Sequence, residues 1–235
     1  MNTPAKVEIK YFSDILCIWA YIAQIRLDEL KTKFGNRIEV QQHFISVFGA
    51  VESKMEQSWN DKGGITAYNK HVRDIAEKFG HIEVHPEIWI KNTPATSASC
   101  HLFLKAIQLL ESSGELADIS ETAATTRSVF ETAVWEMRLA FFRDLIDISN
   151  FDKQLEIAER LGLPMIKIEE QIKNGNAYAA MCHDLQLQEK YNITGSPTLI
   201  LNEGRQIIYG NVGYRVIEAN VQELLNQPDN QASWC

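Results

Sequence analysis

Residues 7–20 read VEIKYFSDILCIWA, an alternating apolar pattern that runs into a cysteine and then into a helical pattern. Residues 7–11 alternate with period two, as a half-buried β-strand does. From Ile18 to Phe34 the apolar spacing predicts a helix, which ends near Gly35. The sequence therefore places Cys17 at a strand-to-helix junction.

Cys17 is the candidate reactive residue of this junction. The N–H groups of a first helical turn are unpaired and carry partial positive charge, which favours a thiolate. Asp14 lies three residues earlier and would act against a thiolate if its carboxylate lay close. The sequence alone does not decide between these two effects.

A second segment, Gly195-Ser196-Pro197-Thr198, precedes an apolar run near the other end of the chain. A proline that opens a strand can form a tight turn, in some cases through a cis bond, that leaves backbone groups free for a ligand. If the fold brings this turn to Cys17, the two segments form a thiol site with a backbone clamp. Taken alone, the segment is also typical of a plain loop.

Length and composition describe an acidic globular chain. Its 235 residues suit one large domain, or one domain that carries an inserted second one. The formal charge of −8 argues against nucleic acid or an anionic membrane as a partner. The first six residues lack an apolar signal segment, and no apolar run approaches the roughly 20 residues of a membrane span. We therefore expect a cytoplasmic location.

The four cysteines, Cys17, Cys100, Cys182 and Cys235, are widely scattered. Their spacing fits neither a disulfide framework nor zinc-ligand pairs, so no metal site is predicted. Cys100 and Cys182 lie in helical patterns and are predicted to be buried as small hydrophobic residues. Cys235 ends a polar tail that is predicted to be disordered.

The remaining pattern predicts an interrupted α/β fold. Residues 38–44 alternate again and complete a β-α-β unit whose strands would be parallel. Two short apolar runs, 198–201 and 206–209, are joined by Asn-Glu-Gly, which predicts a hairpin. Between residues 59 and 174 no strand is predicted. Helices are expected at 67–79, 95–110, 122–145, 152–161, 176–190 and 214–225.

Three groups of residues together resemble the DsbA-like branch of the thioredoxin superfamily, over roughly residues 6–226. They are Tyr11-Phe12-Ser13-Asp14 with Cys17-Ile18-Trp19-Ala20-Tyr21, Asp147-Ile148-Ser149, and Thr194-Gly195-Ser196-Pro197-Thr198. The chain most resembles FrnE-type oxidoreductases, kappa-class glutathione transferases and 2-hydroxychromene-2-carboxylate isomerases. The resemblance implies a thioredoxin-like α/β fold interrupted by an inserted all-helical domain.

The resemblance also predicts the domain boundaries. The thioredoxin-like domain is expected to be discontinuous, with residues 6–50 and 176–228. The inserted helical domain would cover residues 51–175 and roof the active site. Residues 229–235 would form a tail.

The resemblance also assigns a role to Cys17. FrnE-like proteins usually read Cys-Pro-Trp-Cys-Tyr at the active site, and this chain matches that motif at Cys17, Trp19 and Tyr21. Ile18 replaces the proline, and Ala20 replaces the second cysteine. Without that second thiol, a mixed disulfide at Cys17 must be released by another thiol, such as glutathione or a substrate cysteine.

Four further site residues follow from the comparison with the family. Pro197 would be the cis-proline, and the backbone of Ser196 would pair with a bound thiol peptide or with glutathione. Trp19 is either a packing residue or part of the thiol pocket. Asn211, close to the start of the last helix, could help to bind a glutathione carboxylate, although residues 210–214 match the family only loosely.

Three functions are consistent with these residues. The first is a thiol-disulfide oxidoreductase that exchanges disulfides with a peptide, a protein or glutathione through Cys17 alone. The second is a glutathione-dependent transferase or isomerase of small aromatic compounds, which the loss of the second cysteine and the aromatic-rich insert favour. That branch typically has a serine at the position of Cys17. The third is a partner-binding module without turnover. Glutathione would be a co-substrate, with no cofactor bound tightly; the substrate and the oligomeric state do not follow from the sequence.

Overall fold

The computed structural model describes residues 6–117 and 127–226. Its strands are β1 (Val7–Ser13), β2 (Ile38–Phe44), β3 (Thr198–Leu201) and β4 (Gln206–Tyr209). Its α-helices are α1 (Ile18–Phe34), α2 (Val51–Trp59), α3 (Gly64–Ala76), α4 (Ile88–Lys91), α5 (Ala98–Ser112), α7 (Val129–Phe142), α8 (Phe151–Arg160), α9 (Met165–Lys173), α10 (Asn176–Lys190) and α11 (Tyr214–Leu225). Short 3-10 helices lie at Gly35–Arg37, Asn60–Lys62 and Asn202–Gly204. Within these ranges, no helix is both long enough and apolar enough to cross a bilayer.

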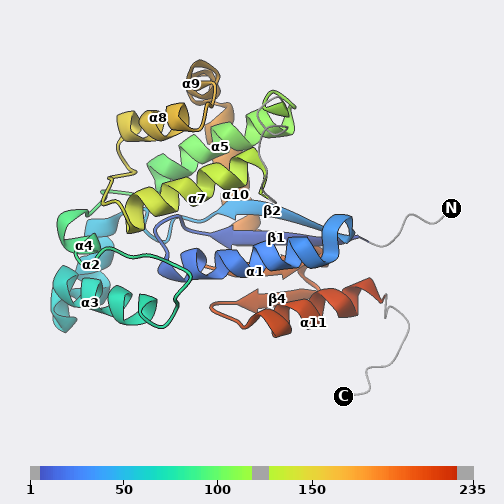
Figure 1. Cartoon of the computed structure of the whole chain (residues 1–235), viewed down its shortest axis with the longest axis horizontal. Helices are drawn as coiled ribbons and strands as arrows, with labels where there is room; N and C mark the ends of the chain where they lie inside the picture. Colours follow the sequence, from blue (N-terminus) through green and yellow to red (C-terminus); the bar gives the residue numbers. More distant parts are fainter. Residues whose placement is uncertain (1–5, 118–126, 227–235) are drawn as a thin grey trace.

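The strands form one mixed sheet in the order β2-β1-β3-β4, at the centre of the molecule (Figure 1). β1 and β2 are parallel, with Val7 opposite Ile38, because α1 carries the chain back along the sheet between them. β3 runs antiparallel to β1, and β4 runs antiparallel to β3. The predicted β-α-β unit and C-terminal hairpin are confirmed, and with them the α/β fold interrupted by helices.

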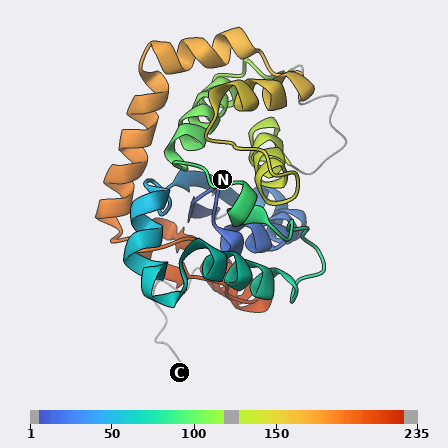
Figure 2. The same cartoon turned by 90° about the vertical axis from the view of Figure 1, so that its left-hand side faces the viewer.

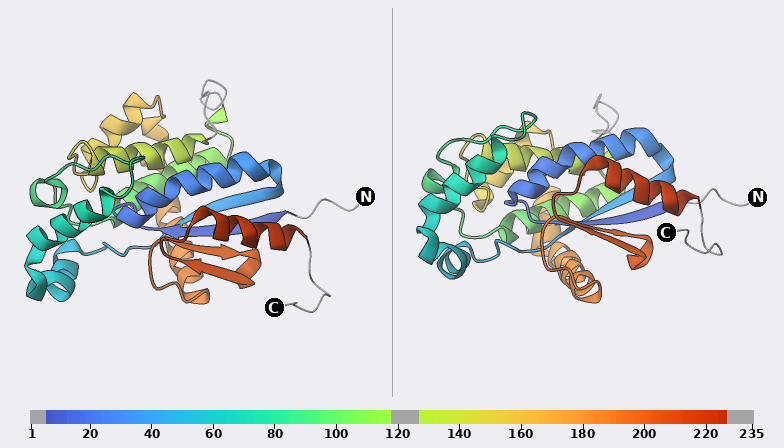
Figure 3. Two further views of the ribbon diagram at one scale, coloured as in Figure 1. Left: turned by 60° about the horizontal axis from the view of Figure 1, so that its bottom comes forward. Right: turned by 90° about the horizontal axis from the view of Figure 1, so that it is seen from below.

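Helices cover both faces of this sheet, because successive strand residues direct apolar side chains to opposite faces. α1 and α11 pack on one face, and α10 crosses the other (Figure 3). The core under α1 and α11 includes Ile9, Tyr11, Leu27, Leu199, Ile217 and Val221. The core on the α10 side is smaller and consists of Phe12, Ile45, Ile193 and Ile200.

The helical segment between β2 and α10 builds the rest of the molecule. α2, α3 and α4 gather near the N-terminal end of α1, whereas α5, α7, α8 and α9 lie above β2 in the view of Figure 1 (Figures 1 and 2). One hydrophobic core spans this segment and continues into the start of α1 and the loop before it, where it includes Leu16, Ile18 and Tyr21. The end of α1 that carries Cys17 is therefore packed against the inserted helices.

In two helices a capping residue fixes the first turn, so that each begins at a residue other than the predicted one. Asn150 accepts hydrogen bonds from the N–H groups of Asp152 and Lys153, so α8 begins at Phe151. The helix predicted at 122–145 is observed only from Val129 to Phe142. Its start is set by a capping box, and residues 118–126 lie outside the described ranges.

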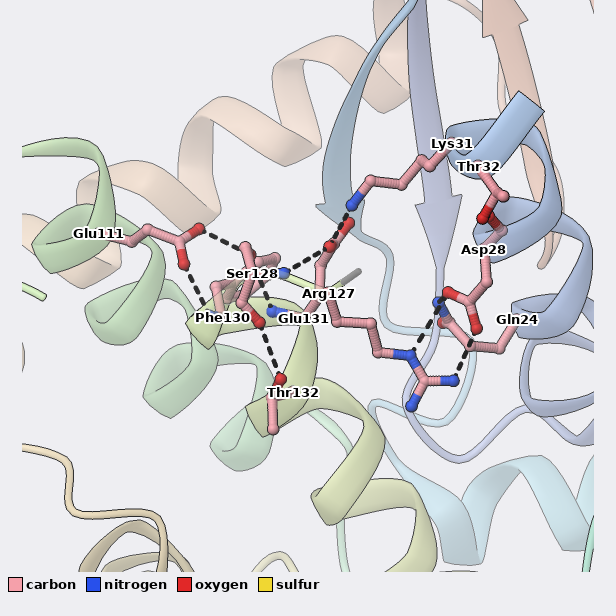
Figure 4. Close-up of polar contacts among 10 residues, drawn as sticks. All are labelled: Gln24, Asp28, Lys31, Thr32, Glu111, Arg127, Ser128, Phe130, Glu131 and Thr132. Atoms are coloured by element: carbon pink, nitrogen blue, oxygen red, sulfur yellow. Dashed lines mark hydrogen bonds and ion pairs between the residues drawn. The ribbon is translucent and has the colours of Figure 1, made fainter. Parts of the chain in front are cut away.

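The start of α7 is also joined to α1 and α5 (Figure 4). Arg127 Nη2 lies 2.6 Å from Asp28 Oδ2, and the Glu131 carboxylate pairs with Lys31 on α1. A carboxylate of α5 accepts two further hydrogen bonds from this segment. These contacts fix the returning chain of the insert against the helix that begins at Cys17.

The predictions for the remaining cysteines have different outcomes. Cys100 is completely buried, as predicted. Cys182 is exposed, so its predicted burial is wrong: α10 turns Ala177 and Asp184 inward and leaves Cys182 on its outer side. The tail 229–235, with Cys235, lies outside the described residues.

Candidate active site

Cys17 lies between β1 and α1, as the N-cap residue of the helix. Its backbone is extended, with φ −80° and ψ 117°. Its carbonyl oxygen accepts hydrogen bonds from the N–H groups of Ala20 and Tyr21, each at 3.1 Å, and its own N–H donates to Asp14 O at 3.1 Å. The thiol therefore sits at the first turn of α1, at the junction that the sequence indicates.

The Ser196–Pro197 turn lies beside this thiol. The Cys17 Sγ–H donates to the carbonyl oxygen of Ser196 at 3.3 Å, across a separation of 179 residues. The peptide bond between Ser196 and Pro197 is cis. The N–H of Asp14 donates to Ser196 Oγ at 2.9 Å. The structure brings the two segments together and joins them through backbone and side chains.

The turn leaves one backbone donor beside the thiol. Pro197 O accepts a hydrogen bond from Gly210 N–H at 2.8 Å, and Thr198 Oγ1 donates to Gly195 O at 2.7 Å. The N–H of Ser196, in contrast, donates to no protein acceptor in the described part of the chain. Ser196 is partly exposed, whereas its neighbours Gly195 and Pro197 are buried.

Asp14 fixes the loop that carries Cys17. Its carboxylate is completely buried, and buried charges of this kind require hydrogen bonds. Oδ1 accepts from the N–H of Leu16, and Oδ2 accepts from the N–H of Phe48 and from Ser97 Oγ, each at 2.8 Å. These donors come from the loop itself, from the segment before α2 and from the start of α5. Asp14 thus connects the thiol loop to the inserted helices.

The surroundings of Cys17 favour its neutral thiol. Only 7% of the residue is exposed, and burial raises the pKa of the thiol above its ordinary value. The Asp14 carboxylate acts in the same direction, whereas the hydrogen bond with Ser196 and the N–H groups of Ala20 and Trp19 lower the pKa without cancelling the rise. The helix terminus is therefore outweighed by burial, which the sequence did not show.

Aromatic side chains of the insert surround this end of α1. Tyr68 of α3 is buried, and burial, followed by the charges of Cys17 and Asp14, raises the pKa of its hydroxyl. Its ring centroid lies 6.2 Å from that of Phe48 and 5.1 Å from that of Trp89. The inserted helices thus supply apolar surroundings for the thiol.

Trp19 packs against an aromatic side chain of the insert, whereas Asn211 makes a hydrogen bond at the surface. Trp19 is half-buried and meets Phe79 edge-on, with 6.3 Å between ring centroids. Asn211 lies in the loop between β4 and α11, where its Oδ1 accepts a hydrogen bond from Arg26 Nη1 at 2.6 Å. This contact holds the N-terminus of α11 against α1, and it places a guanidinium beside the predicted carboxylate site.

Comparison with known families assigns the architecture. The sequence matches the DsbA-like thioredoxin domain over residues 8–222. The chain belongs to this family. A comparison with curated proteins finds no significant match. In this DsbA-like chain, the Cys17 thiol lies beside the cis Ser196–Pro197 bond.

Solved structures share the fold of this DsbA-like chain at low sequence identity. A probable DsbA oxidoreductase from Streptomyces coelicolor has a TM-score of 0.69 and 14% identity, covering 97% of this chain and 93% of the other. The cytosolic disulfide reductase DsbM from Pseudomonas aeruginosa has a TM-score of 0.65 and 17% identity, covering 92% and 99%. A 2-hydroxychromene-2-carboxylate isomerase has a TM-score of 0.61 and 15% identity, covering 96% and 100%. The common feature is the fold.

The site of this DsbA-like chain includes residues that sequence reasoning missed. Phe48 lies just before the insert and Tyr68 and Ser97 lie in it, and no local pattern connects these residues with Cys17. The sequence predicts for Asp14 only an electrostatic effect on the thiol. Its position in an otherwise apolar segment was a usable signal, because a carboxylate there has to be buried with several donors.

Proposed function

We propose that this DsbA-like protein is a thiol-disulfide oxidoreductase that works through Cys17 as its single active-site thiol. The observation that carries the proposal is the 3.3 Å contact between Cys17 Sγ and Ser196 O, at the cis Ser196–Pro197 bond. Ala20 stands where FrnE-like proteins have a second cysteine, so an external thiol is required to complete a cycle.

In the reducing direction, Cys17 takes part in two exchange steps. The Cys17 thiol first loses its proton to solvent, and the thiolate attacks one sulfur of a substrate disulfide. That S–S bond breaks, a mixed disulfide forms on Cys17, and the departing thiolate takes up a proton. An external thiolate then attacks the substrate sulfur of the mixed disulfide, which returns Cys17 as a thiolate and leaves that substrate half joined to the external thiol. A second external thiol breaks this last bond, so that the second substrate thiol is released and the two external thiols leave as a disulfide. Two external thiols thus supply the two electrons that reduce one substrate disulfide.

The free Ser196 N–H supports an extended thiol peptide as the ligand. A peptide that pairs with this donor would bring its sulfur to Cys17 largely regardless of its side chains. Glutathione is a peptide of this kind and suits the role of external thiol in a cytoplasmic setting. DsbM, one of the structural neighbours, has been solved with GSH. Arg26, Asn211 and the N-terminus of α11 would receive its carboxylate.

The direct test measures reduction of a peptide disulfide by glutathione. Cys17→Ser is expected to abolish catalysis, because among the described residues Cys17 alone has its thiol hydrogen-bonded to Ser196. Cys182→Ser is the matched control, since Cys182 is exposed on α10 and its loss should leave the rate unchanged. Equal turnover of the wild-type protein and the Cys17→Ser variant would discard the proposal.

The second position of the motif offers a gain-of-function test. Ala20→Cys places a thiol one helical turn from Cys17 and is expected to let the protein release its own mixed disulfide. Mass spectrometry would then find a Cys17 adduct that decays without added glutathione. An adduct equally long-lived in both proteins would show that residue 20 does not control release.

The raised pKa of Cys17 favours a second candidate function, a glutathione-dependent isomerase or transferase of small aromatic compounds. A neutral thiol can donate a hydrogen bond to the thiolate of glutathione, as the serine of that branch would. Under this alternative, Cys17→Ser keeps or improves activity while disulfide exchange is lost. A protein that binds glutathione or a thiol peptide but turns over neither kind of substrate would instead be a partner-binding module.

A further inference from the structure

Tyr209, on the edge strand β4, lies against the Ser196–Pro197 turn. It is the last residue of β4 and pairs with Thr198, the first residue of β3. β4 is the edge strand of the sheet, at its lower side in Figure 1. The next residue, Gly210, donates its N–H to Pro197 O at 2.8 Å. The tyrosine is therefore held next to the cis-proline turn by two backbone links.

The ring of Tyr209 covers Gly195 closely. A Cβ atom added to Gly195 would lie 2.6 Å from Tyr209 Oη and 2.8 Å from its Cε2, closer than real Cβ contacts. A side chain at position 195 would therefore have to displace the ring, and glycine lets the ring lie against the turn. The phenol ring thus covers the buried Gly195 and lies next to Ser196, which is partly exposed and carries the free N–H.

This surface faces outward and is largely apolar. Tyr209 is 61% exposed and Ile207 is 56% exposed, although both are large hydrophobic residues. They alternate with Ile208, which is buried in the core under α1 and α11, so both lie on the other face of β4. Two exposed apolar side chains next to a free backbone donor are a usual arrangement for binding an extended peptide.

We propose that Ser196, Ile207 and Tyr209 form a peptide-binding surface, the Tyr209 surface, that selects an aromatic or apolar residue beside the substrate cysteine. The inference rests on the proposed function, because it places the substrate backbone on Ser196. Side chains alternate along such a peptide, so the residue beside the cysteine lies on the phenol ring that covers Gly195, while the cysteine faces Cys17. Tyr209 is then a specificity-determining residue that takes no part in sulfur chemistry.

The experiment measures peptide binding by calorimetry, with serine in place of the peptide cysteine so that no disulfide can form. Two peptides differ only in the residue beside that serine, which is phenylalanine or aspartate. We expect the phenylalanine peptide to bind about tenfold more tightly, the factor for one good aromatic contact. Tyr209→Ala should remove this preference, Tyr209→Phe should keep it, and Ile207→Ser should reduce it.

Val216→Ala is the matched control, because Val216 is also an exposed hydrophobic residue but lies on α11. It should bind both peptides as the wild-type protein does. Equal binding of the two peptides by the wild type, no binding of either, or an unchanged preference in both Tyr209→Ala and Ile207→Ser would overturn the proposal. Reaction of Cys17 with a small aromatic disulfide is measured in parallel. If the wild-type protein does not react, the proposed function is contradicted, and the binding measurements alone decide whether the Tyr209 surface selects the peptide.

Discussion

Cys17 lies at a helix N-terminus, where thiols are often reactive, but its side chain is buried. The helix N-terminus and the contact with Ser196 favour ionisation, whereas burial and Asp14 oppose it more strongly. A thiol with a raised pKa forms little thiolate at neutral pH, but that thiolate is intrinsically more nucleophilic than one from an acidic thiol. Under the proposed function, these surroundings predict slow exchange with a peptide that first binds at Ser196.

Asp14 is expected to tune this thiol and to stabilise the loop at the same time. In Asp14→Asn an amide N–H₂ faces at least one of the three donors that the carboxylate accepts, so we expect a loss of about 2 kcal/mol in unfolding free energy. Removing the negative charge should also lower the pKa of Cys17, because Asp14 raises it. Denaturant unfolding measures the first effect, and the pH dependence of Cys17 alkylation measures the second.

Ser97→Ala separates these two effects. It removes one of the hydrogen bonds to Asp14 but leaves the charge in place, so it should reduce stability without lowering the pKa of the thiol. If Asp14→Asn leaves the alkylation profile where it was, Asp14 does not tune Cys17.

At the scale of elements, helix α10 is attached to β2 and α5 by a buried ionic cluster. Asp184 Oδ2 lies 2.7 Å from Lys105 Nζ and accepts the N–H of Phe44 at 2.7 Å, while Oδ1 contacts His43 Nδ1 at 2.7 Å. Burial opposes the charged carboxylate, but the hydrogen bond from His43 and the charge of Lys105 outweigh it, so the pKa of Asp184 is lowered. Burial also lowers the pKa of His43.

Both shifts make the fold less stable in acid. The folded-state pKa of Asp184 is below its unfolded value of about 3.9, so its stabilising contribution is present above that pH and is lost as pH falls. The lowered pKa of His43 means that the unfolded chain binds a proton first as pH falls through about 6.5. We expect the unfolding free energy to decrease from pH 7 downward and Asp184→Asn to flatten the acidic part of the profile.

A double-mutant cycle tests the ion pair itself. Asp184→Asn leaves the buried Lys105 ammonium without its counter-charge and should cost about 3 kcal/mol at pH 7. Adding Lys105→Met should recover part of this loss, so that the two changes are not additive. Asp74→Asn, in the exposed pair with Lys70, is the control and should leave stability unchanged. Additive losses would show that the pair is not coupled.

At the scale of the molecule, local sequence patterns were sufficient to predict helices and strands, but not which residues are buried or which side chains they contact. Strand alternation and the Asn-Glu-Gly turn were sufficient for the β-α-β unit and the hairpin, because both are local. That Cys17 meets Ser196 followed from the family resemblance, since no local rule joins segments so far apart. The burial of Cys17, the exposure of Cys182 and the contact of Tyr209 with Gly195 depend on tertiary packing, which a single sequence does not reveal.

The most direct test of a single-thiol site is to identify the residue that forms a mixed disulfide. The wild-type protein is incubated with oxidised glutathione under native conditions, and the adduct is located by peptide mass spectrometry. The account predicts an adduct on Cys17 that persists until an external thiol is added and is absent in Cys17→Ser. Modification of the exposed Cys182 alone, with Cys17 unmodified at every pH at which the protein stays folded, would contradict it.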